Sequence, residues 1–517
     1  MERLHDACGV VGIYAHENDE SIDVRHYLTL ALTALQHRGQ ESAGMAVYDS
    51  EGKIVHRVGM GKVREVFSDT GNTLPQTRCG IGHVRYSTTG SSCVENAGPF
   101  VVGQEHSYEA IAVAHNGNLV NGPALREQLP QELLHSTTDS EAIALLLLYA
   151  EGKTLRERMI ATFPLLRGAY SLVILADGKL YAMRDPWGMR PLCIGRIGEH
   201  WVVASESCAL DRIGATFVRK VEPGELITID DQGMRSEILV KAPRKTLCVF
   251  ECIYFSDATT QLNGRYVYGI REALGRELAR EHPAEADLVV PVPDSSIPAA
   301  LAYAATSGIP YGQAIIKNRY SDRTFIKPDQ RLRQLEVDLK FNLVKPKIDG
   351  ARLVVVDDSI VRGNTMKRLV AALRHQGAKE IHLRSSAPAL RHPCYFGIDI
   401  PQKAELIAAG RSVQEIAEYI GVDSLGYLSI AGLGRAIASV EGATDNHKGH
   451  LYDDEKATNL LHSEFCYGCM ATQGWPFNPV GAQFTAPRMK MRPASFTERD
   501  NVAITVKSTS EVHRCVY

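Results

Sequence analysis

The stretch VVVDDSIVRGNT, residues 354–365, decides the fold of the second half of this 517-residue chain. An apolar β-branched run ends in two adjacent acids, Asp357 and Asp358, and a polar loop containing Gly363 follows. Residues 366–373 then carry apolar side chains at helical spacing. This order predicts a buried strand, a loop and the start of a helix. Backbone N–H groups at such a helix start suit a phosphate, and the carboxylates can hold sugar hydroxyls or a metal bound to them.

The stretch resembles the phosphoribosyl-pyrophosphate (PRPP) motif of the type I phosphoribosyltransferases. The alternative is an acidic strand-to-helix turn in which Gly363 only marks the bend. The resemblance implies that the two acids contact the ribose and its metal and that the following loop holds the 5-phosphate. The PRPP-binding residues implied within the stretch are Asp357, Asp358, Ser359, Arg362, Gly363, Asn364 and Thr365.

The surrounding sequence alternates strand and helix patterns. Apolar runs at residues 288–290 and 314–316 flank a helical pattern at residues 297–307. This alternation predicts a parallel sheet with crossover helices. Ligands of such sheets bind at the carboxyl ends of the strands, which is where Asp357 and Asp358 are expected.

Two kinds of loop complete the predicted PRPP site. The sequence Val-Pro-Asp-Ser ending at Ser295 follows a strand and can wrap a pyrophosphate. Basic segments at residues 317–320, 323–326 and 331–334 form either a solvated basic face or an anion-gripping loop, and we favour the loop. They resemble the family's lid, which implies PRPP contacts for Lys317, Arg319 and Tyr320 and, weakly, for Lys340. The resemblance also implies Mg²⁺ near Ser295, Asp357 and Asp358.

The first half of the chain opens with a cysteine, Cys8, at the start of the strand-like CGVVGIY. If the seven preceding residues are removed, Cys8 becomes N-terminal. Its α-amino group, with an ordinary pKa of about 7.7–8.0, could then act as the base for its own thiol. Taken alone, Cys8 fits a buried core cysteine better.

Other motifs of this half strengthen the catalytic interpretation. QHRGQES, GHVRYSTTG, AHNGNLV and TTDSE follow Cys8 in that order. The guanidinium of Arg85 can grip a carboxylate with parallel hydrogen bonds, and Asp139 can accept from an ammonium group. Asn-Gly usually marks a hairpin turn, but beside a nucleophile the Asn116 amide and the Gly117 N–H would form an oxyanion hole.

These motifs resemble the N-terminal-nucleophile glutamine amidotransferases. The resemblance implies that Cys8 attacks the glutamine side-chain amide, with Asn116 and Gly117 stabilising the oxyanion. It implies glutamine binding through Arg85 on the α-carboxylate and Asp139 on the α-amino group, with Arg38 lining the site. The stretches at residues 168–172, 184–192 and 204–207 are interpreted as turns and core strands.

The chain contains eleven cysteines, and those that lie close together in the sequence are candidate metal ligands or nucleophiles. The spacing of Cys466 and Cys469 suits zinc, an iron–sulfur cluster or a redox pair. The sequence alone does not fix which distant cysteines join them. Resemblance to the iron–sulfur-containing, Bacillus-like and animal-like branch of the family implies a [4Fe–4S] cluster held by Cys248, Cys394, Cys466 and Cys469.

Composition excludes several classes of protein. Charged residues make up 23% and hydrophobic residues 44% of the chain, as in ordinary globular proteins. A net charge of −3 argues against nucleic-acid binding over the whole surface. No apolar run is long enough to span a membrane, and the start lacks a signal-peptide core. We therefore expect a cytoplasmic protein that binds neither nucleic acid nor membrane.

The expected domain order combines an α+β half and an α/β half. Residues 1–7 are a propeptide, and residues 8–242 form a glutamine amidotransferase domain, a four-layer αββα sandwich of N-terminal-nucleophile type. Residues 243–475, after the basic linker KAPRK, form a type I phosphoribosyltransferase parallel-sheet domain that carries the iron–sulfur ligands. Residues 476–517 lack periodicity, which predicts a mobile tail.

Together the two halves, over roughly residues 8–469, resemble the amidophosphoribosyltransferase family, the glutamine–PRPP amidotransferases. The implied reaction converts glutamine, PRPP and water into 5-phosphoribosylamine, glutamate and pyrophosphate. The resemblance also implies purine nucleotide feedback inhibitors and a homo-oligomer, either a tetramer or a dimer. The segment YFSDATT at residues 254–260 departs from the Ala-Arg-Pro-Asp-Ser run that is frequent in the family, which puts the contacts there in doubt.

Two other functions would use only part of this sequence. Another glutamine-dependent amidotransferase, such as a hexosamine-phosphate synthase, would not need residues 354–365. A PRPP-sensing regulator without catalysis would carry a DNA-binding appendage. It would not explain the presence of Cys8, Arg85 and Asp139.

Overall fold

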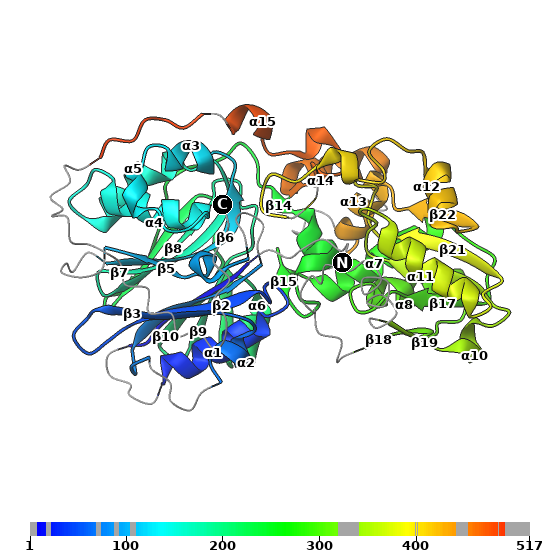
Figure 1. The fold of residues 1–517 in the computed structure, drawn as a ribbon, viewed down its shortest axis with the longest axis horizontal. Coiled ribbons are helices and arrows are strands. Elements are labelled where there is room, and N and C mark those ends of the chain that lie inside the picture. Colours follow the sequence, from blue (N-terminus) through cyan, green and yellow to red (C-terminus); the bar gives the residue numbers. More distant parts are fainter. Residues whose placement is uncertain are drawn as a thin grey trace. The chain divides into compact units, whose positions relative to one another are not determined.

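The computed structural model describes residues 8–16, 22–68, 74–86, 92–103, 110–318, 341–398, 400, 402–440, 453–483 and 485–491. The predicted propeptide and three predicted PRPP contacts, Arg319, Tyr320 and Lys340, lie outside these ranges. The chain forms two compact units whose segments interleave along the sequence (Figure 1). The Cys8 unit comprises His5–Leu247, Tyr395–Asp399 and Pro476–Tyr517. The Asp357 unit comprises Met1–Leu4, Cys248–Cys394 and Ile400–Trp475.

Two antiparallel sheets form the centre of the Cys8 unit. The seven-stranded sheet has the order β11 (Thr216–Lys220), β9 (Cys193–Ile197), β10 (His200–Ala204), β1 (Gly9–Tyr14), β4 (Cys79–Arg85), β2 (Ser42–Tyr48), β3 (Ile54–Met60). The six-stranded sheet has the order β13 (Gly233–Ile238), β12 (Glu225–Asp230), β8 (Lys179–Arg184), β7 (Gly168–Ala176), β6 (Ile111–Leu119), β5 (Phe100–Val102).

Helices cover the outer face of each sheet (Figure 1). On one side lie α1 (Val24–Ala34), α2 (Val63–Val66) and α6 (Ser207–Arg212). On the other side lie α3 (Gly122–Arg126), α4 (Asp139–Tyr149) and α5 (Leu155–Thr162). The unit is therefore an αββα sandwich, which confirms the predicted fold.

The alternation of β1 explains why two sheets and two helical layers form. Successive side chains of a strand point to opposite faces. Val10 and Tyr14 belong to the core between the sheets, whereas Val11 and Ile13 belong to the core that packs with α1. Because both faces of β1 are apolar, both must be covered.

The Asp357 unit contains the predicted parallel sheet. Its strand order is β17 (Leu288–Pro291), β20 (Arg352–Asp357), β21 (Glu380–Ser385), β22 (Ser424–Tyr427), with every neighbouring pair parallel. Its helices are α7 (Val267–Glu281), α8 (Ile297–Ser307), α10 (Lys345–Ile348), α11 (Asn364–His375), α12 (Val413–Ile420), α13 (Ile430–Ala438) and α14 (Asp454–Glu464).

One predicted strand of this unit lies elsewhere. The apolar run at 314–316 forms β18 (Ile315–Lys317), which pairs antiparallel with β19 (Phe341–Leu343) instead of entering the parallel sheet. Two other short ladders join β14 (Leu247–Cys248) to β23 (Phe465–Cys466) and β15 (Gln261–Leu262) to β16 (Arg265–Tyr266). Single turns of helix are η1 (Val94–Asn96), η2 (Gln131–Leu133), η3 (Phe163–Leu165), η4 (Glu251–Phe255), η5 (Lys403–Glu405) and η7 (Thr472–Gly474).

The tail after residue 476 packs on the Cys8 unit as far as it is described. After α15 (Pro479–Ala482), the Glu151 N–H donates to the Lys490 carbonyl at 3.2 Å. Met489 and Met491 pack against the core that contains α4 and β6. Residues 485–491 therefore have apolar side chains with a core to cover, and the mobility expected of the tail stays a prediction. Among the described helices, none has the length and apolarity needed to cross a membrane.

Candidate active sites

Cys8 lies immediately before β1, and its neighbourhood fixes its main chain. The Arg38 Nε donates to the Cys8 carbonyl at 3.0 Å, and the Val10 N–H donates to Ser205 Oγ at 2.9 Å. The thiol faces the carbonyl oxygen of Tyr86 at 3.8 Å. Burial raises the pKa of the Cys8 thiol, and the nearby Arg85 cation opposes that rise. The thiol therefore needs a base to become a nucleophile.

A pocket opens at this point between the two sheets of the Cys8 unit. The first sheet supplies Cys8 and Arg85, whereas the second sheet and the start of α4 supply Gly117 and Asp139. Four predicted site residues, far apart in sequence, thus meet at one cavity. The complete lining is Cys8, His83, Arg85, Tyr86, Phe100, His115, Gly117, Thr138, Asp139 and Ser140.

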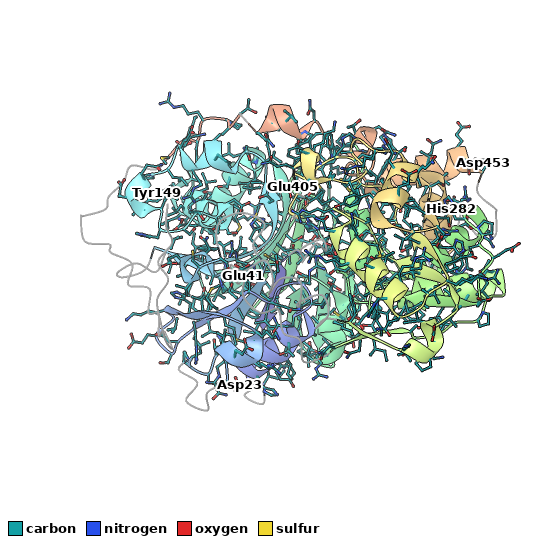
Figure 2. The ribbon with its side chains drawn as sticks, turned by 45° about the vertical axis from the view of Figure 1, so that its right-hand side comes forward. Asp23, Glu41, Tyr149, His282, Glu405 and Asp453 are labelled. Atoms are coloured by element: carbon teal, nitrogen blue, oxygen red, sulfur yellow. The ribbon has the colours of Figure 1, made fainter. Side chains whose placement is uncertain are left out.

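The pocket carries one buried cation and one buried anion. Arg85 lies at the end of β4, with its Nη1 3.6 Å from Glu41 Oε1 (Glu41 is labelled in Figure 2). The Leu119 N–H donates to Asp139 Oδ2 at 2.8 Å. Burial pushes the pKa of Asp139 upward, but His115 and backbone N–H groups outweigh burial and bring it below its ordinary value. Such a pair suits the carboxylate and ammonium groups of an amino acid.

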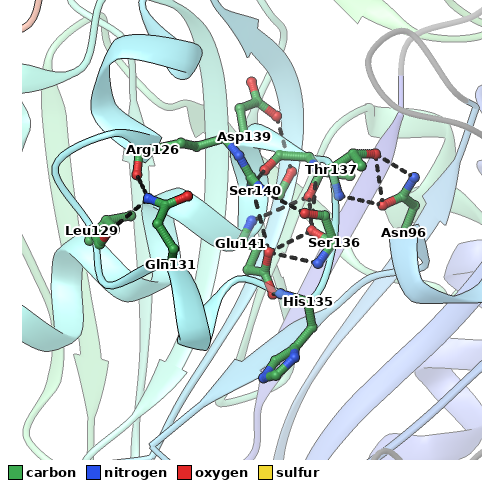
Figure 3. A network of polar contacts seen from close by, with 11 residues as sticks. Asn96, Arg126, Leu129, Gln131, His135, Ser136, Thr137, Asp139, Ser140 and Glu141 are labelled. Carbon is green, nitrogen blue, oxygen red and sulfur yellow. Dashed lines mark hydrogen bonds and ion pairs between the residues drawn. The ribbon is translucent and has the colours of Figure 1, made fainter. Parts of the chain in front are cut away.

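A dense polar network holds the loop that leads into α4 (Figure 3). The carboxylate of Glu141 accepts from the His135 N–H at 2.8 Å and from the Ser136 N–H at 2.9 Å. The Thr137 N–H donates to Asn96 Oδ1 at 3.0 Å. With so many backbone groups bound, the first helical residue, Asp139, has a fixed position.

Asn116 and Gly117 lie on β6, opposite the Cys8 sheet. Ala112 and Ala114 of this strand face the core between the sheets, so the alternation points Asn116 in the same direction. Asn116 is fully buried, and within the described ranges neither its amide nitrogen nor its amide oxygen has a hydrogen-bond partner. Leaving a buried polar group unpaired costs about 1–3 kcal/mol, so the amide is available to a ligand.

Arg38 lies behind Cys8 and is absent from the pocket lining, contrary to the expectation that it lines the site. Its guanidinium is buried and forms an ion pair with Glu206, which also accepts from His37 Nε2 at 2.9 Å. Glu206 was interpreted only as part of a core strand. An acid at the end of an apolar strand was the signal that could have identified it.

The second site lies at the carboxyl ends of β17 and β20. Ser295 Oγ donates to Asp358 Oδ2 at 2.5 Å, and Ser359 Oγ donates to Asp358 Oδ1 at 2.7 Å. The Asp358 N–H donates to Asp357 Oδ1 at 3.0 Å. Both carboxyl groups are buried. The three residues expected near Mg²⁺, namely Ser295, Asp357 and Asp358, therefore lie side by side on two neighbouring strand ends.

The loop that joins β20 to α11 has the geometry of an anion site. Gly363 caps the helix with a φ of +81°, which L side chains rarely adopt. Asn364 Oδ1 accepts from the Tyr419 hydroxyl at 2.6 Å. Arg362 Nε donates to Glu405 Oε2 at 2.8 Å (Glu405 is labelled in Figure 2). The N-terminus of α11, with Thr365 in its first turn, therefore has the backbone arrangement that favours an anion.

Lys317 lies next to the Val-Pro-Asp-Ser loop, residues 292–295, of the same unit. Its Nζ donates to Asp294 Oδ2 at 2.6 Å. Asp294 directly precedes Ser295 in the Val-Pro-Asp-Ser loop. The structure therefore brings Lys317 to the predicted PRPP site, whereas Arg319 and Tyr320 lie outside the described residues.

The four cysteines predicted to bind the cluster lie near one another. Cys248 in β14 and Cys466 in β23 belong to one short ladder. The Cys469 carbonyl accepts from the main-chain N–H groups of residues 391 and 392 at 2.9 and 3.0 Å, which draws the segment bearing Cys394 to it. Burial, followed by the three neighbouring thiols, raises the pKa of the Cys469 thiol.

This donor set fits a thiolate-bound metal centre, zinc or iron–sulfur, in its chemistry. Throughout the described part of the chain, however, no three His, Cys, Asp or Glu side chains are arranged as metal ligands.

Comparisons with known proteins cover both sites. Residues 85–212 match the family described as a glutamine amidotransferase domain, and residues 263–394 match the phosphoribosyl transferase domain. The chain is 47% identical over 445 residues to the amidophosphoribosyltransferase of Methanothermobacter thermautotrophicus, covering 85% of this chain and 92% of the relative. It is 42% identical over 463 residues to that of Bacillus subtilis, covering 89% and 94%.

Solved structures agree with the sequence matches. Glutamine PRPP amidotransferase from B. subtilis, complexed with ADP and GMP, superposes with a TM-score of 0.79 and 40% identity, covering 90% of this chain and 96% of that one. A structure described as the allosteric regulatory enzyme of purine biosynthesis gives a TM-score of 0.80 and 41% identity, covering 90% and 95%.

Proposed function

The chain belongs to the amidophosphoribosyltransferase family, and from this premise we propose how its residues divide the reaction. The enzyme releases ammonia from glutamine and transfers it to C1 of PRPP, giving 5-phosphoribosylamine, glutamate and pyrophosphate in the first step of purine biosynthesis. One observation carries the assignment. A single chain holds a Cys8–Arg85–Asp139 pocket in one unit and the adjacent Asp357 and Asp358 beside a phosphate loop in the other.

This combination disfavours the two alternatives. An amidotransferase with a different acceptor gives no reason for the phosphoribosyl transferase match at residues 263–394. A PRPP-sensing regulator gives no reason for a pocket that joins Cys8 to a buried cation and a buried anion.

In the glutaminase half, Arg85 binds the α-carboxylate of glutamine and Asp139 binds its α-ammonium group. The Cys8 sulfur attacks the side-chain carbonyl carbon, and its proton passes to the departing amide nitrogen, which leaves as ammonia. The Asn116 amide and the Gly117 N–H stabilise the oxyanion, and water then hydrolyses the thioester to glutamate. The unpaired buried amide of Asn116 supports this role.

Two further residues of this half have assigned tasks. Arg38 holds the Cys8 carbonyl and acts as a positioning residue. The base is the α-amino group of Cys8, which requires removal of residues 1–7. That step lies outside the described residues and stays a prediction.

In the acceptor half, Asp357 and Asp358 bind the ribose hydroxyls, while the Gly363 loop, with Arg362, Asn364 and Thr365, binds the 5-phosphate. Ser359, Lys317, Arg319 and Tyr320 complete the proposed contacts to PRPP. The loop before Ser295 wraps the pyrophosphate, whose departure leaves oxocarbenium character at C1 for ammonia to attack. When bound at Ser295, Asp357 and Asp358, Mg²⁺ supplies charge neutralisation to the pyrophosphate.

Several partners remain proposals. A [4Fe–4S] cluster on Cys248, Cys394, Cys466 and Cys469 is supported by the proximity of the four thiols. Inhibition by purine nucleotides is supported by the relative that was solved with ADP and GMP. A homo-oligomer, tetramer or dimer, and a cytoplasmic location stay predictions from the sequence.

The decisive experiment measures pyrophosphate release by an anaerobically prepared, iron-replete sample. Release must require both PRPP and a nitrogen source, and glutamine must serve as that source. Absence of release under these conditions contradicts the assignment. Mass spectrometry of the active protein should show a chain that begins at Cys8, whereas an active chain with Met1 intact contradicts the α-amino base.

Replacing the nucleophile separates the two half-reactions. Cys8→Ser should lower glutamine-dependent synthesis by roughly 10³-fold or more, because the thiolate nucleophile is lost. Synthesis from free ammonia should stay near the wild-type rate, since the PRPP site is intact. Loss of both activities would mean that Cys8 acts in folding or processing instead.

A further inference from the structure

A segment from the second half of the sequence packs against the oxyanion strand of the first. Residues 395–398 directly follow Cys394 in the chain, yet they belong to the Cys8 unit. The Asn118 Nδ2 donates to the Tyr395 carbonyl at 2.9 Å, and the Arg190 Nη2 donates to the Phe396 carbonyl at 2.7 Å. Both donors thus hold the main chain of this segment.

Gly397 brings the segment into contact with the Gly117 peptide. Its φ is +90°, and a Cβ added there would lie 2.9 Å from the carbonyl carbon of Gly117 and 3.1 Å from its oxygen. The same Cβ would lie 3.2 Å from Arg190 Nη2. The obstructing atoms include main chain, which cannot move aside as a flexible side chain does. A side chain at residue 397 must therefore displace the Gly117 peptide.

Arg190 is itself held rigidly by its own loop. Its side chain is 1% exposed, and its carbonyl accepts from Arg184 Nε at 2.8 Å and from Ser171 Oγ at 3.3 Å. The buried Asp185 carboxylate accepts from the Trp187 N–H at 2.9 Å. The motif at residues 184–192, which the mechanism leaves without a task, is thus a fixed support for the guanidinium.

The oxyanion part of β6 needs such support. Strand β5 pairs only with Ile111, Ala112 and Val113 of β6, whereas β7 pairs with β6 from Ala112 to Leu119. Within the described sheet, Gly117 therefore has a strand neighbour on one side only. The segment at 395–397 lies against this part of β6.

We propose that residues 395–397 and Arg190 form a clamp on the Gly117 carbonyl that fixes the main chain at Gly117, and with it the Gly117 N–H, in the position that binds the oxyanion. Arg190, Asn118 and Gly397 are positioning residues, and the proposal rests on the assignment of Asn116 and Gly117 as oxyanion donors. Donors accelerate a reaction only when they are preorganised around charge that develops in the transition state. Loosening the clamp therefore lowers kcat for glutamine and leaves its KM unchanged.

A matched pair of glycine substitutions tests the clamp in the full-length enzyme. Gly397→Ala adds a Cβ against Gly117, whereas Gly233→Ala adds one at a φ of +91° with no atom within 4 Å. The two changes share the backbone strain but not the contact. Gly397→Ala should lower kcat for glutamine hydrolysis about tenfold or more, with KM within about twofold. Gly233→Ala should match the wild type, and ammonia-dependent synthesis should be unchanged in both.

A binding measurement gives a second readout. An aldehyde analogue of glutamine forms a tetrahedral adduct with the Cys8 thiol, and the adduct's oxygen occupies the oxyanion site. In the Gly397→Ala enzyme its affinity should fall by the same factor as kcat, while the affinity for glutamate stays constant. If Gly397→Ala does not fold, Asn118→Asp takes its place. That change keeps the side-chain shape but turns a carboxylate oxygen toward the Tyr395 carbonyl, and it should show the same pattern.

Asn116→Ala distinguishes failure of the clamp from failure of the oxyanion assignment. If Asn116→Ala lowers kcat by about 10²–10³-fold while Gly397→Ala behaves like Gly233→Ala, the clamp is wrong and the assignment stands. If Asn116→Ala leaves kcat unchanged, the oxyanion assignment fails and the clamp with it. An equal loss of kcat and of ammonia-dependent synthesis in Gly397→Ala would show a general structural defect and would also overturn the clamp.

Discussion

Arg38 and Glu206 form an ion pair that is almost completely removed from solvent, directly behind Cys8. Burying two charges usually costs more than their attraction returns, so such a pair is weak evidence for stability. Here the pair has a positional consequence, because the same guanidinium binds the Cys8 carbonyl. Removing one partner of a buried pair typically costs about 3–5 kcal/mol, so a variant of Glu206 alone is a poor probe of catalysis.

His83, which lines the pocket, should make the free energy of unfolding depend on pH. Burial and the Arg85 cation lower the pKa of His83 to about 3, whereas the unfolded chain restores a value of about 6.5. The stabilising contribution of neutral His83 is therefore complete above pH 6.5 and is lost as the pH falls toward 3. The expected loss is about 1.4 kcal/mol per pH unit within that window.

Urea unfolding of the wild type and of His83→Gln at pH 7, 6 and 5 measures this contribution. As the pH decreases, the free energy of unfolding of the variant should fall less steeply than that of the wild type. The difference should be about 1.4 kcal/mol per pH unit. Parallel slopes for the two proteins would show that folding does not lower the pKa of His83.

At the scale of elements, the turn into α11 depends on a residue without a side chain. Gly363 has a φ of +81°, and a Cβ there would lie 2.5 Å from Ile407 Cδ1. Gly350, in the same unit, has a φ of +74° with no atom within 4 Å of an added Cβ. Ile407 is buried in the core of this unit, so its side chain gives way only by disturbing its neighbours. Gly363→Ala should therefore shift the turn or Ile407, whereas Gly350→Ala adds only backbone strain of about 1–2 kcal/mol.

Steady-state kinetics with saturating ammonia separates the two variants. Gly363→Ala should raise the KM for PRPP about tenfold or more, which corresponds to about 1.4 kcal/mol or more of lost binding. Gly350→Ala should leave that KM near the wild-type value. Equal KM values in both variants would show that a side chain at position 363 does not disturb the binding of PRPP.

Local sequence patterns predicted the elements that carry chemistry. The β-branched run that ends in Asp357 forms β20, and the helical spacing after Gly363 forms α11, because strand and helix periodicity are properties of neighbouring residues. The pairing of β18 with β19 was missed, since pairing depends on where a distant segment returns. The Arg38–Glu206 pair was missed for the same reason. The residues next to Arg38 in the sequence do not indicate Glu206 as its partner, and those next to Glu206 do not indicate Arg38.

At the scale of the whole molecule, the tail is a structural part of the Cys8 unit. Ala486, Met489 and Met491 pack against its core. A chain that ends after Trp475 should lose about 2–4 kcal/mol of the unfolding free energy of this unit, because partly buried apolar side chains are removed. Glutamine-dependent synthesis should fall more than ammonia-dependent synthesis.

A chain that ends after Met491 is the control for this truncation. It keeps the contacts of residues 485–491, so a loss of stability that appears only in the shorter chain comes from residues 476–491. If the chain ending at Trp475 is equally stable, the packing of Met489 and Met491 contributes nothing to the fold.

The interleaving of the two units has a consequence for protein synthesis. The Cys8 unit takes its residues from His5–Leu247, but also from Tyr395–Asp399 and from the tail. A ribosome that stops early therefore releases a chain in which Cys8 lacks some segments of its own unit. Such a fragment should lack glutaminase activity, because part of the unit that carries Cys8 is missing. Release of ammonia from glutamine should therefore require a chain that has been translated past the acceptor half.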